Sequence, residues 1–141
     1  MFSQTVEYAL RAMVQLAADS SGSATTKDIA AKAKVPSAYL AKVLQSMRRG
    51  GLIHSRRGVG GGVTLAKPAA KISLLDVIDA VEPLKRQPNK KVATANQLQK
   101  SMDTAVDQLR SKFASESLAD MIPKGKSVKA APAKRPAAKK R

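Results

Sequence analysis

The residues best suited to chemistry in this sequence are two adjacent arginines that precede a run of glycines. Arg56 and Arg57 begin the segment RRGVGGG, which ends at residue 62. Arginines on such a loop can enter a minor groove of DNA, and the glycines, Gly60 among them, let the backbone approach phosphate closely. A nucleotide-binding loop is excluded, because Gly58, Gly60 and then Val63 break the dinucleotide spacing and no GKS or GKT follows. The segment therefore predicts contact with nucleic acid.

A second set of candidate residues lies at the start of a helix that we expect to open at Pro36. The outward positions near its start are Ser37, Ala38, Tyr39, Ala41 and Lys42. If this helix enters the major groove N-terminus first, serine can donate or accept, lysine suits guanine acceptors, and the positive helix end favours phosphate. The alternative is a solvated polar face. The expected DNA contacts are Ser37, Ala38, Tyr39, Lys42, Arg48, Arg49, Arg56, Arg57 and Gly60.

Two short helices around Val35 would position these residues. The second of them is the helix that opens at Pro36, and the first is expected from Lys27 to Ala33, with Thr26 as its N-cap. The apolar positions of the two helices match a helix-turn-helix, although Lys34 occupies the turn position where glycine is common. The alternative is an ordinary pair of helices. The positions are Ile29, Ala30, Ala33, Val35, Leu40 and Val43.

The remaining elements complete a fold that is mainly α with a small β-hairpin wing. Periodicity predicts a first helix over residues 3–19, strands over 52–55 and 63–66, and a fourth helix capped by Ser73 and ended by Pro83. Its inward residues are Leu74, Val77, Ile78 and Val81. We expect a winged helix-turn-helix DNA-binding domain over 1–83, a linker over 84–94, a C-terminal dimerisation helix with a short terminal helix over 95–121, and a disordered basic tail over 122–141.

The long C-terminal helix, over about 95–115, has an apolar face that needs a partner. We expect this partner to be a second copy of the chain, giving a homodimer, with docking on another protein as the alternative. The face consists of Leu98, Met102, Ala105, Val106, Leu109 and Phe113.

Composition limits the class of protein. The chain has 141 residues with 26 Lys and Arg against 10 Asp and Glu, a net charge of +16 that favours a polyanionic partner. Eight of the basic residues lie in 122–141, so a DNA-compacting protein is the alternative function. With two Phe, two Tyr and no Trp, modules that stack single-stranded bases are disfavoured.

Catalytic and metal chemistry are not expected. The chain has no cysteine, which excludes thiolate zinc sites, cysteine nucleophiles and cysteine-held iron–sulfur clusters. His54, the single histidine, makes a poor metal site alone, and no nucleophile elbow, HExxH or paired-carboxylate motif is present. Residues 1–17 read as neither a signal peptide nor a membrane span. We expect a protein that is not an enzyme and has no cofactor.

Three segments together resemble the Rrf2 family of winged-helix regulators. They are EYALRAMVQLA at 7–17, DIAAKAKVPSAYLAKVLQSMRRGGLIHSRRGVGGGVTLAKP at 28–68 and ISLLDVIDAVE at 72–82. The resemblance implies a symmetric dimer on a two-fold-related operator, repression, and a cytoplasmic, nucleoid-associated location. By position in the family motif, Tyr39 would touch phosphate, Ser37, Ala38 and Lys42 would lie at base edges, and Arg57 would enter the minor groove.

The sequence also departs from that family. Many relatives hold an iron–sulfur cluster on three cysteines between the fourth helix and the dimer helix, whereas residues 85–91 are KRQPNKK here. Ala41 replaces an acidic residue that helps some relatives choose operators, and Glu7 stands where a basic residue is common. We therefore expect neither a cluster nor the relatives' operator preference, and an unknown effector or protein partner would supply the signal.

Overall fold

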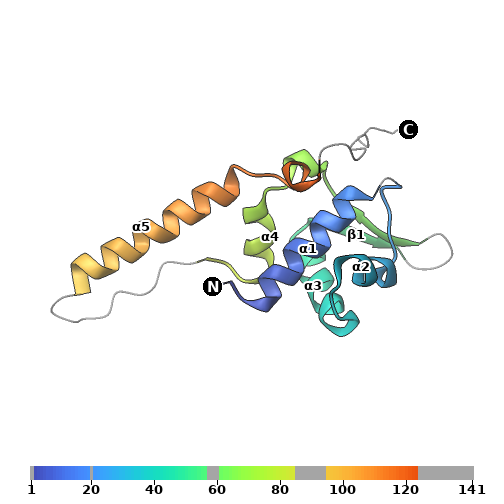
Figure 1. Cartoon of the computed structure of the whole chain (residues 1–141), viewed down its shortest axis with the longest axis horizontal. Helices are drawn as coiled ribbons and strands as arrows, with labels where there is room; N and C mark the ends of the chain where they lie inside the picture. The colour runs from blue at the N-terminus through green and yellow to red at the C-terminus, as the bar shows by residue number, and fades with distance from the viewer. Residues whose placement is uncertain (1, 20, 57–60, 85–94, 124–141) are drawn as a thin grey trace.

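The computed structural model describes residues 2–19, 21–56, 61–84 and 95–123, and its fold is a winged helix-turn-helix followed by a long helix (Figure 1). The fold class predicted from the sequence is confirmed. The elements in chain order are α1 (Gln4–Ala18), α2 (Thr26–Ala33), α3 (Ser37–Arg49), β1 (Ile53–Arg56), β2 (Gly62–Leu65), the short 3-10 turn η1 (Ala69–Lys71), α4 (Leu74–Val81), α5 (Ala95–Ala114) and the 3-10 turn η2 (Ala119–Met121).

Side-chain caps fix where the helices begin. At the start of α4, Ser73 and Asp76 form a reciprocal capping box, with both hydrogen bonds at 3.0 Å. The cap of α2 differs from the prediction: it is Thr25, whose hydroxyl accepts the Asp28 N–H at 3.0 Å, and Thr26 is already helical. The prediction was wrong by one residue because two adjacent threonines offer the same hydroxyl. Only Thr25 lies three positions before Asp28, the spacing at which a cap accepts the N3 N–H.

The core is aliphatic and centres on α1, which packs against α2, α3 and α4. Met13, Leu40 and Met47 are fully buried at its centre, as the helical periodicity predicts. Val81, expected to face inward, is only half-buried. Leu118 and Ile122, which follow α5, are also buried, so the core draws on residues beyond 83.

The described part of the wing consists of β1 and β2, which pair antiparallel with Ile53 opposite Leu65 and Arg56 opposite Gly62. Both strands differ by one residue from the predicted 52–55 and 63–66. Leu52 is buried and joins the two elements: its N–H bonds the Met47 carbonyl at the end of α3 at 3.0 Å, and its carbonyl accepts the Ala66 N–H at 2.9 Å, just before the strands begin.

The wing is tied to the loop between α1 and α2. Ala24 and Val63 exchange two backbone hydrogen bonds, of 3.1 and 2.7 Å. Gly62 allows this approach, because a Cβ there would lie 2.9 Å from the Ala24 carbonyl oxygen. The base of the wing is therefore fixed relative to the helix-turn-helix.

Helix α5 extends away from the bundle of α1 to α4, and among the described residues its C-terminal end lies against that bundle (Figure 1). There Phe113 packs edge-on against Phe2, with ring centroids 5.6 Å apart. Beyond α5 the backbone pairs with the start of α4: the Leu74 N–H bonds the Glu116 carbonyl, and the Leu118 N–H bonds the Ile72 carbonyl, both at 2.9 Å. Among the described residues no helix is long and apolar enough to cross a membrane.

Candidate nucleic-acid interface

Helix α3 presents one exposed polar and basic face above a buried apolar one. Ser37, Ala38, Tyr39 and Lys42 are all exposed. The opposite face, formed by Leu40, Val43, Leu44 and Met47, is buried in the core. Pro36 at the N-cap makes no side-chain hydrogen bond to the first turn, so no side chain at that position competes with an external anion for those N–H groups.

The turn before α3 holds a lysine in a left-handed conformation. Lys34 ends α2 with φ 57° and ψ 51°, the region in which glycine is preferred. Its N–H and that of Val35 both bond the Ala30 carbonyl. The Lys34 carbonyl in turn accepts a hydrogen bond of 2.9 Å from Arg11 Nη2. Arg11 thus connects α1 directly to the turn that sets the direction of α3.

A small aromatic cluster supports the start of α3 from the same side. The Tyr39 ring meets the Tyr8 ring edge to face, with centroids 5.2 Å apart and planes at 73°. The Arg11 guanidinium carbon lies 5.1 Å from the centre of the Tyr8 ring. Tyr39 therefore has one edge packed and 40% of its surface exposed.

Sequence reasoning did not select Tyr8 or Arg11. Both lie on α1, three residues apart and thus on one side of the helix, outside the set Val6, Ala9 and Met13 that faces the core. An aromatic and a cation at this spacing are a usable signal, but the contacts with Lys34 and Tyr39 depend on how α1 crosses the helix-turn-helix.

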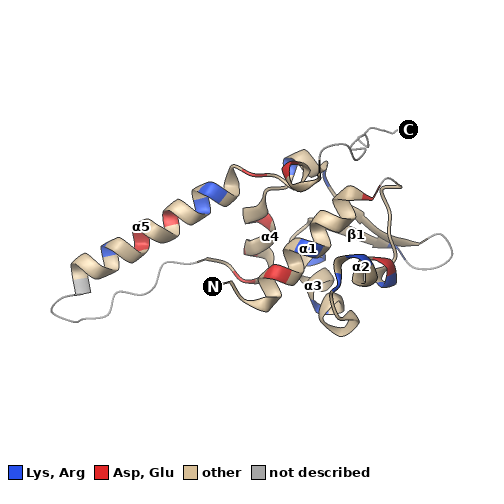
Figure 2. Ribbon diagram, viewed as in Figure 1, with Lys and Arg blue, Asp and Glu red and all other residues tan. Residues whose placement is uncertain are grey.

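Three of the remaining predicted DNA contacts lie within the described residues. Arg48 and Arg49 are exposed in its last turn, and Arg56 is exposed at the end of β1. Arg57 and Gly60 lie outside the described residues, so their contacts stay predictions. Since α3 contains three basic residues and no acidic one, its charge suits a polyanion. Helix α5, by contrast, carries both signs along its length (Figure 2).

The predicted apolar face of α5 divides into two parts. Leu98 is 63% and Met102 42% exposed, and Ala105 is exposed beside them. Val106 and Leu109 are half-buried, as is Phe113 in its contact with Phe2. No described residue therefore buries the N-terminal part of this apolar face, which lies furthest from the bundle.

The part of the chain that the structure describes holds no cluster of side chains suited to a metal ion. No three His, Cys, Asp or Glu side chains come together there. His54 is exposed on β1, opposite Thr64. Asp19 lies at the end of α1 away from Tyr8. Its carboxylate accepts hydrogen bonds from the Ser21 hydroxyl and N–H, and these bonds lower the pKa of Asp19.

Several known proteins similar to this chain are HTH-type transcriptional regulators. An HTH-type transcriptional regulator of Mycobacterium tuberculosis is 42% identical over 81 residues, which are 57% of this chain and 50% of that protein. The HTH-type transcriptional regulator IscR of Cronobacter sakazakii is 38% identical over 76 residues, 53% of this chain and 47% of the relative. The chain thus spans about half the length of the curated relatives it matches.

Solved structures match over a longer stretch. CymR, the global cysteine regulator of B. subtilis, superposes with a TM-score of 0.72 at 24% identity, covering 86% of this chain and 95% of that one. The oxidized form of Staphylococcus aureus CymR gives a TM-score of 0.69 at 28% identity, with 86% and 94% covered. The family model "Rrf2: Iron-dependent Transcriptional regulator" matches residues 2–124. Since this match spans most of the sequence, the chain belongs to the Rrf2 family of transcriptional regulators, as the sequence motifs predicted.

Proposed function

We propose that this protein is a sequence-specific DNA-binding regulator that acts as a homodimer on a palindromic operator and represses transcription there. The observation that carries the proposal is the face of α3: exposed, free of acidic residues, and flanked by the base of an anchored wing. Helices presented in this way read the major groove with the residues of their first turns.

The exposed residues of α3 would contact two parts of the DNA, the base edges and the phosphates. Ser37, Ala38 and Lys42 would reach base edges, with Lys42 on guanine O6 or N7. Tyr39, held by Tyr8, and Arg48 and Arg49 would contact phosphates, which set register without reading sequence. Arg56, Arg57 and Gly60 would contact the neighbouring minor groove and its backbone.

Homodimerisation would use α5. The exposed Leu98, Met102 and Ala105 form an apolar surface on a helix that stands clear of the bundle, and a second copy related by a two-fold axis would cover it. Two α3 helices so related would read inverted half-sites about 34 Å apart, one turn of DNA. Bound over a promoter, such a dimer would exclude polymerase.

The family description implies an iron site, and the residues of this chain do not fit an iron–sulfur cluster. Clusters in proteins are held mainly by cysteine thiolates, and the 141 residues contain none. The described residues also bring no three alternative ligands together. We therefore propose regulation without an iron–sulfur cluster, through another effector or a protein partner, in the cytoplasm at the nucleoid.

A second candidate function is DNA compaction, and the composition of the C-terminus favours it. Residues 124–141, which lie outside the described ranges, hold eight basic residues and no acidic one. Such a segment gives affinity that depends on salt and not on sequence.

Genome-wide mapping of bound DNA in the native cell distinguishes the two functions. Discrete sites that share a palindrome support the regulator, whereas broad occupancy that follows DNA density supports the compactor. Purified Lys42→Ala protein refines the result: we expect preference at one base pair per half-site to relax while affinity for scrambled duplex is nearly unchanged. Equal loss on every duplex would contradict base reading by Lys42.

A further inference from the structure

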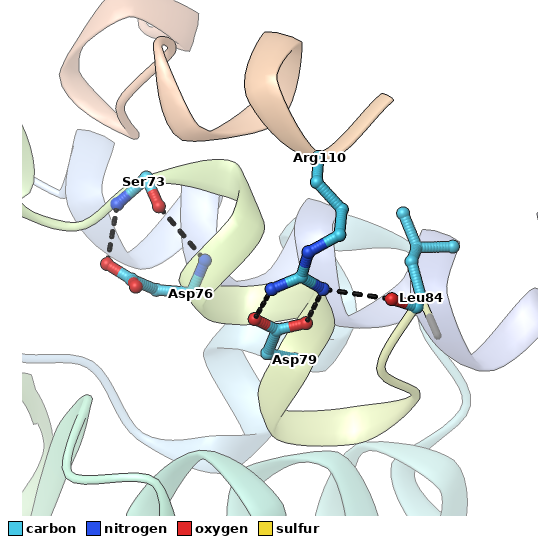
Figure 3. Close-up of polar contacts among 5 residues, drawn as sticks. All are labelled: Ser73, Asp76, Asp79, Leu84 and Arg110. Carbon is cyan, nitrogen blue, oxygen red and sulfur yellow. Dashed lines mark hydrogen bonds and ion pairs between the residues drawn. The ribbon is translucent and has the colours of Figure 1, made fainter. Parts of the chain in front are cut away.

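One guanidinium joins α5 to α4 and to Leu84, three residues beyond the end of α4 (Figure 3). Arg110 on α5 donates from Nη1 to Asp79 Oδ1 at 3.0 Å and from Nη2 to Asp79 Oδ2 at 3.2 Å. Nη1 also donates to the Leu84 carbonyl at 2.9 Å. We call this arrangement the Arg110 fork. It is planar and bidentate, so it constrains direction as well as distance.

The fork is one side-chain attachment between the end of α5 and the rest of the described chain. Another is the packing of Phe113 on Phe2, three residues further along α5. An edge-on aromatic contact allows a helix to pivot about it. A second attachment about 4.5 Å along the helix axis removes that freedom.

The length of α5 turns a small pivot into a large displacement. Leu98 lies 12 residues before Arg110, which is about 18 Å along the helix axis. A pivot of about 10° would move Leu98 by about 3 Å, close to the ~3.4 Å rise of one base pair. Since Leu98 lies in the proposed dimer contact, the angle at Arg110 would determine where the second α3 meets DNA.

We propose that the Arg110 fork selects the spacing between operator half-sites by fixing the angle between α5 and the DNA-binding domain. This inference rests on the proposed homodimer. Arg110 is a positioning residue, because it acts through α5 and not on DNA. Both side chains of the pair are more than a third exposed, at 36% and 37%, so its loss leaves the fold in place.

The test uses the full chain and a DNA duplex selected by the wild-type protein from a random library. Its two half-sites are then moved apart or together by one and two base pairs, and binding is measured by fluorescence anisotropy. One inserted base pair shifts a half-site by about 3.4 Å and rotates it by about 35°. We expect the wild type to lose at least about tenfold in affinity per base pair of misplacement, because a rigid dimer cannot follow this shift.

Arg110→Lys and Asp79→Asn are the test variants. Lysine keeps the charge but cannot form the fork, and asparagine keeps the shape but not the carboxylate. We expect both variants to bind all spacings within about threefold of one another, with unchanged affinity for a single half-site. Lys112→Gln is the matched control: it removes a charge from the same helix, and its partner Glu116, at 3.5 Å, does not lie on α4. It should keep the wild-type profile.

Light scattering and thermal melting on each protein separate the outcomes. Arg110→Lys or Asp79→Asn protein that is dimeric, folded and still selective for one spacing would overturn the inference while leaving the proposed function intact. A wild-type protein that is monomeric, or indifferent to spacing, would overturn the inference together with the homodimer. Loss of spacing preference in Lys112→Gln would show that charge alone matters, and would also overturn it.

Discussion

Replacing Arg11 with alanine removes two contacts that orient the start of α3. The first is the hydrogen bond of 2.9 Å to the Lys34 carbonyl, and the second is the stacking 5.1 Å from the Tyr8 ring centre. A charged donor on a carbonyl is worth about 1.5–3 kcal/mol when buried, and about 1 kcal/mol is reasonable for this exposed arginine. Exposed cation–π stacking adds about 0.5 kcal/mol. Together they predict a loss of about 1.5 kcal/mol in the free energy of unfolding.

Urea denaturation at fixed protein concentration measures this change. With a slope near 1.5 kcal/mol per molar urea, the midpoint should fall by about 1 M. Affinity for operator should also fall, by about three- to tenfold, because the backbone of the turn at Lys34 sets the direction of α3. Lys27→Ala, which removes an exposed charge from α2, is the control and should change stability by less than about 0.5 kcal/mol. A loss below that value for Arg11→Ala as well would refute the assignment of Arg11 as a support of α3.

Three other predictions concern the dimer, the metal and the tail. The Leu98 side chain is 63% exposed in the single chain, so Leu98→Asp should convert the dimer to a monomer in light scattering without lowering the secondary-structure content. An unchanged mass would count against α5 as the interface. Purified protein should be colourless, with operator binding that neither an iron chelator nor oxygen alters, and an absorbing chromophore with matching iron content would contradict this. Removing residues 124–141 should weaken operator and scrambled duplex alike and flatten the salt dependence of binding, whereas an unchanged salt slope would show that the tail does not neutralise phosphate.

The sequence was sufficient to predict the helices, because burial repeats along each of them. Leu40, Val43 and Met47 at spacings of three and four predict both the existence of α3 and its inward face, which leaves Lys42 exposed. Boundaries were less determined where neighbouring residues are equivalent, as at Thr25 and Thr26. They were also less determined at Leu52, whose backbone bonds both the end of α3 and the hairpin.

Contacts between distant elements could not be predicted from the same pattern. Arg11 meets Lys34, and Arg110 meets Asp79, only because of how whole helices cross. Arginines at such positions read as surface residues in a periodic sequence. The function of such an arginine depends on which partner the packing of helices brings within about 3 Å. Local residue spacing does not reveal that partner.

The burial of Leu118 and Ile122 has a consequence for how the protein is made. Leu118 bonds the Ile72 backbone and packs in the core with α1, yet it follows α5 in the chain. During synthesis the DNA-binding helices leave the ribosome first, but their core stays open until residues 118–122 have emerged. A chain that stops within α5 therefore lacks both the end of α5 and the residues that close its core. We expect such prematurely terminated products to be degraded faster than the full chain.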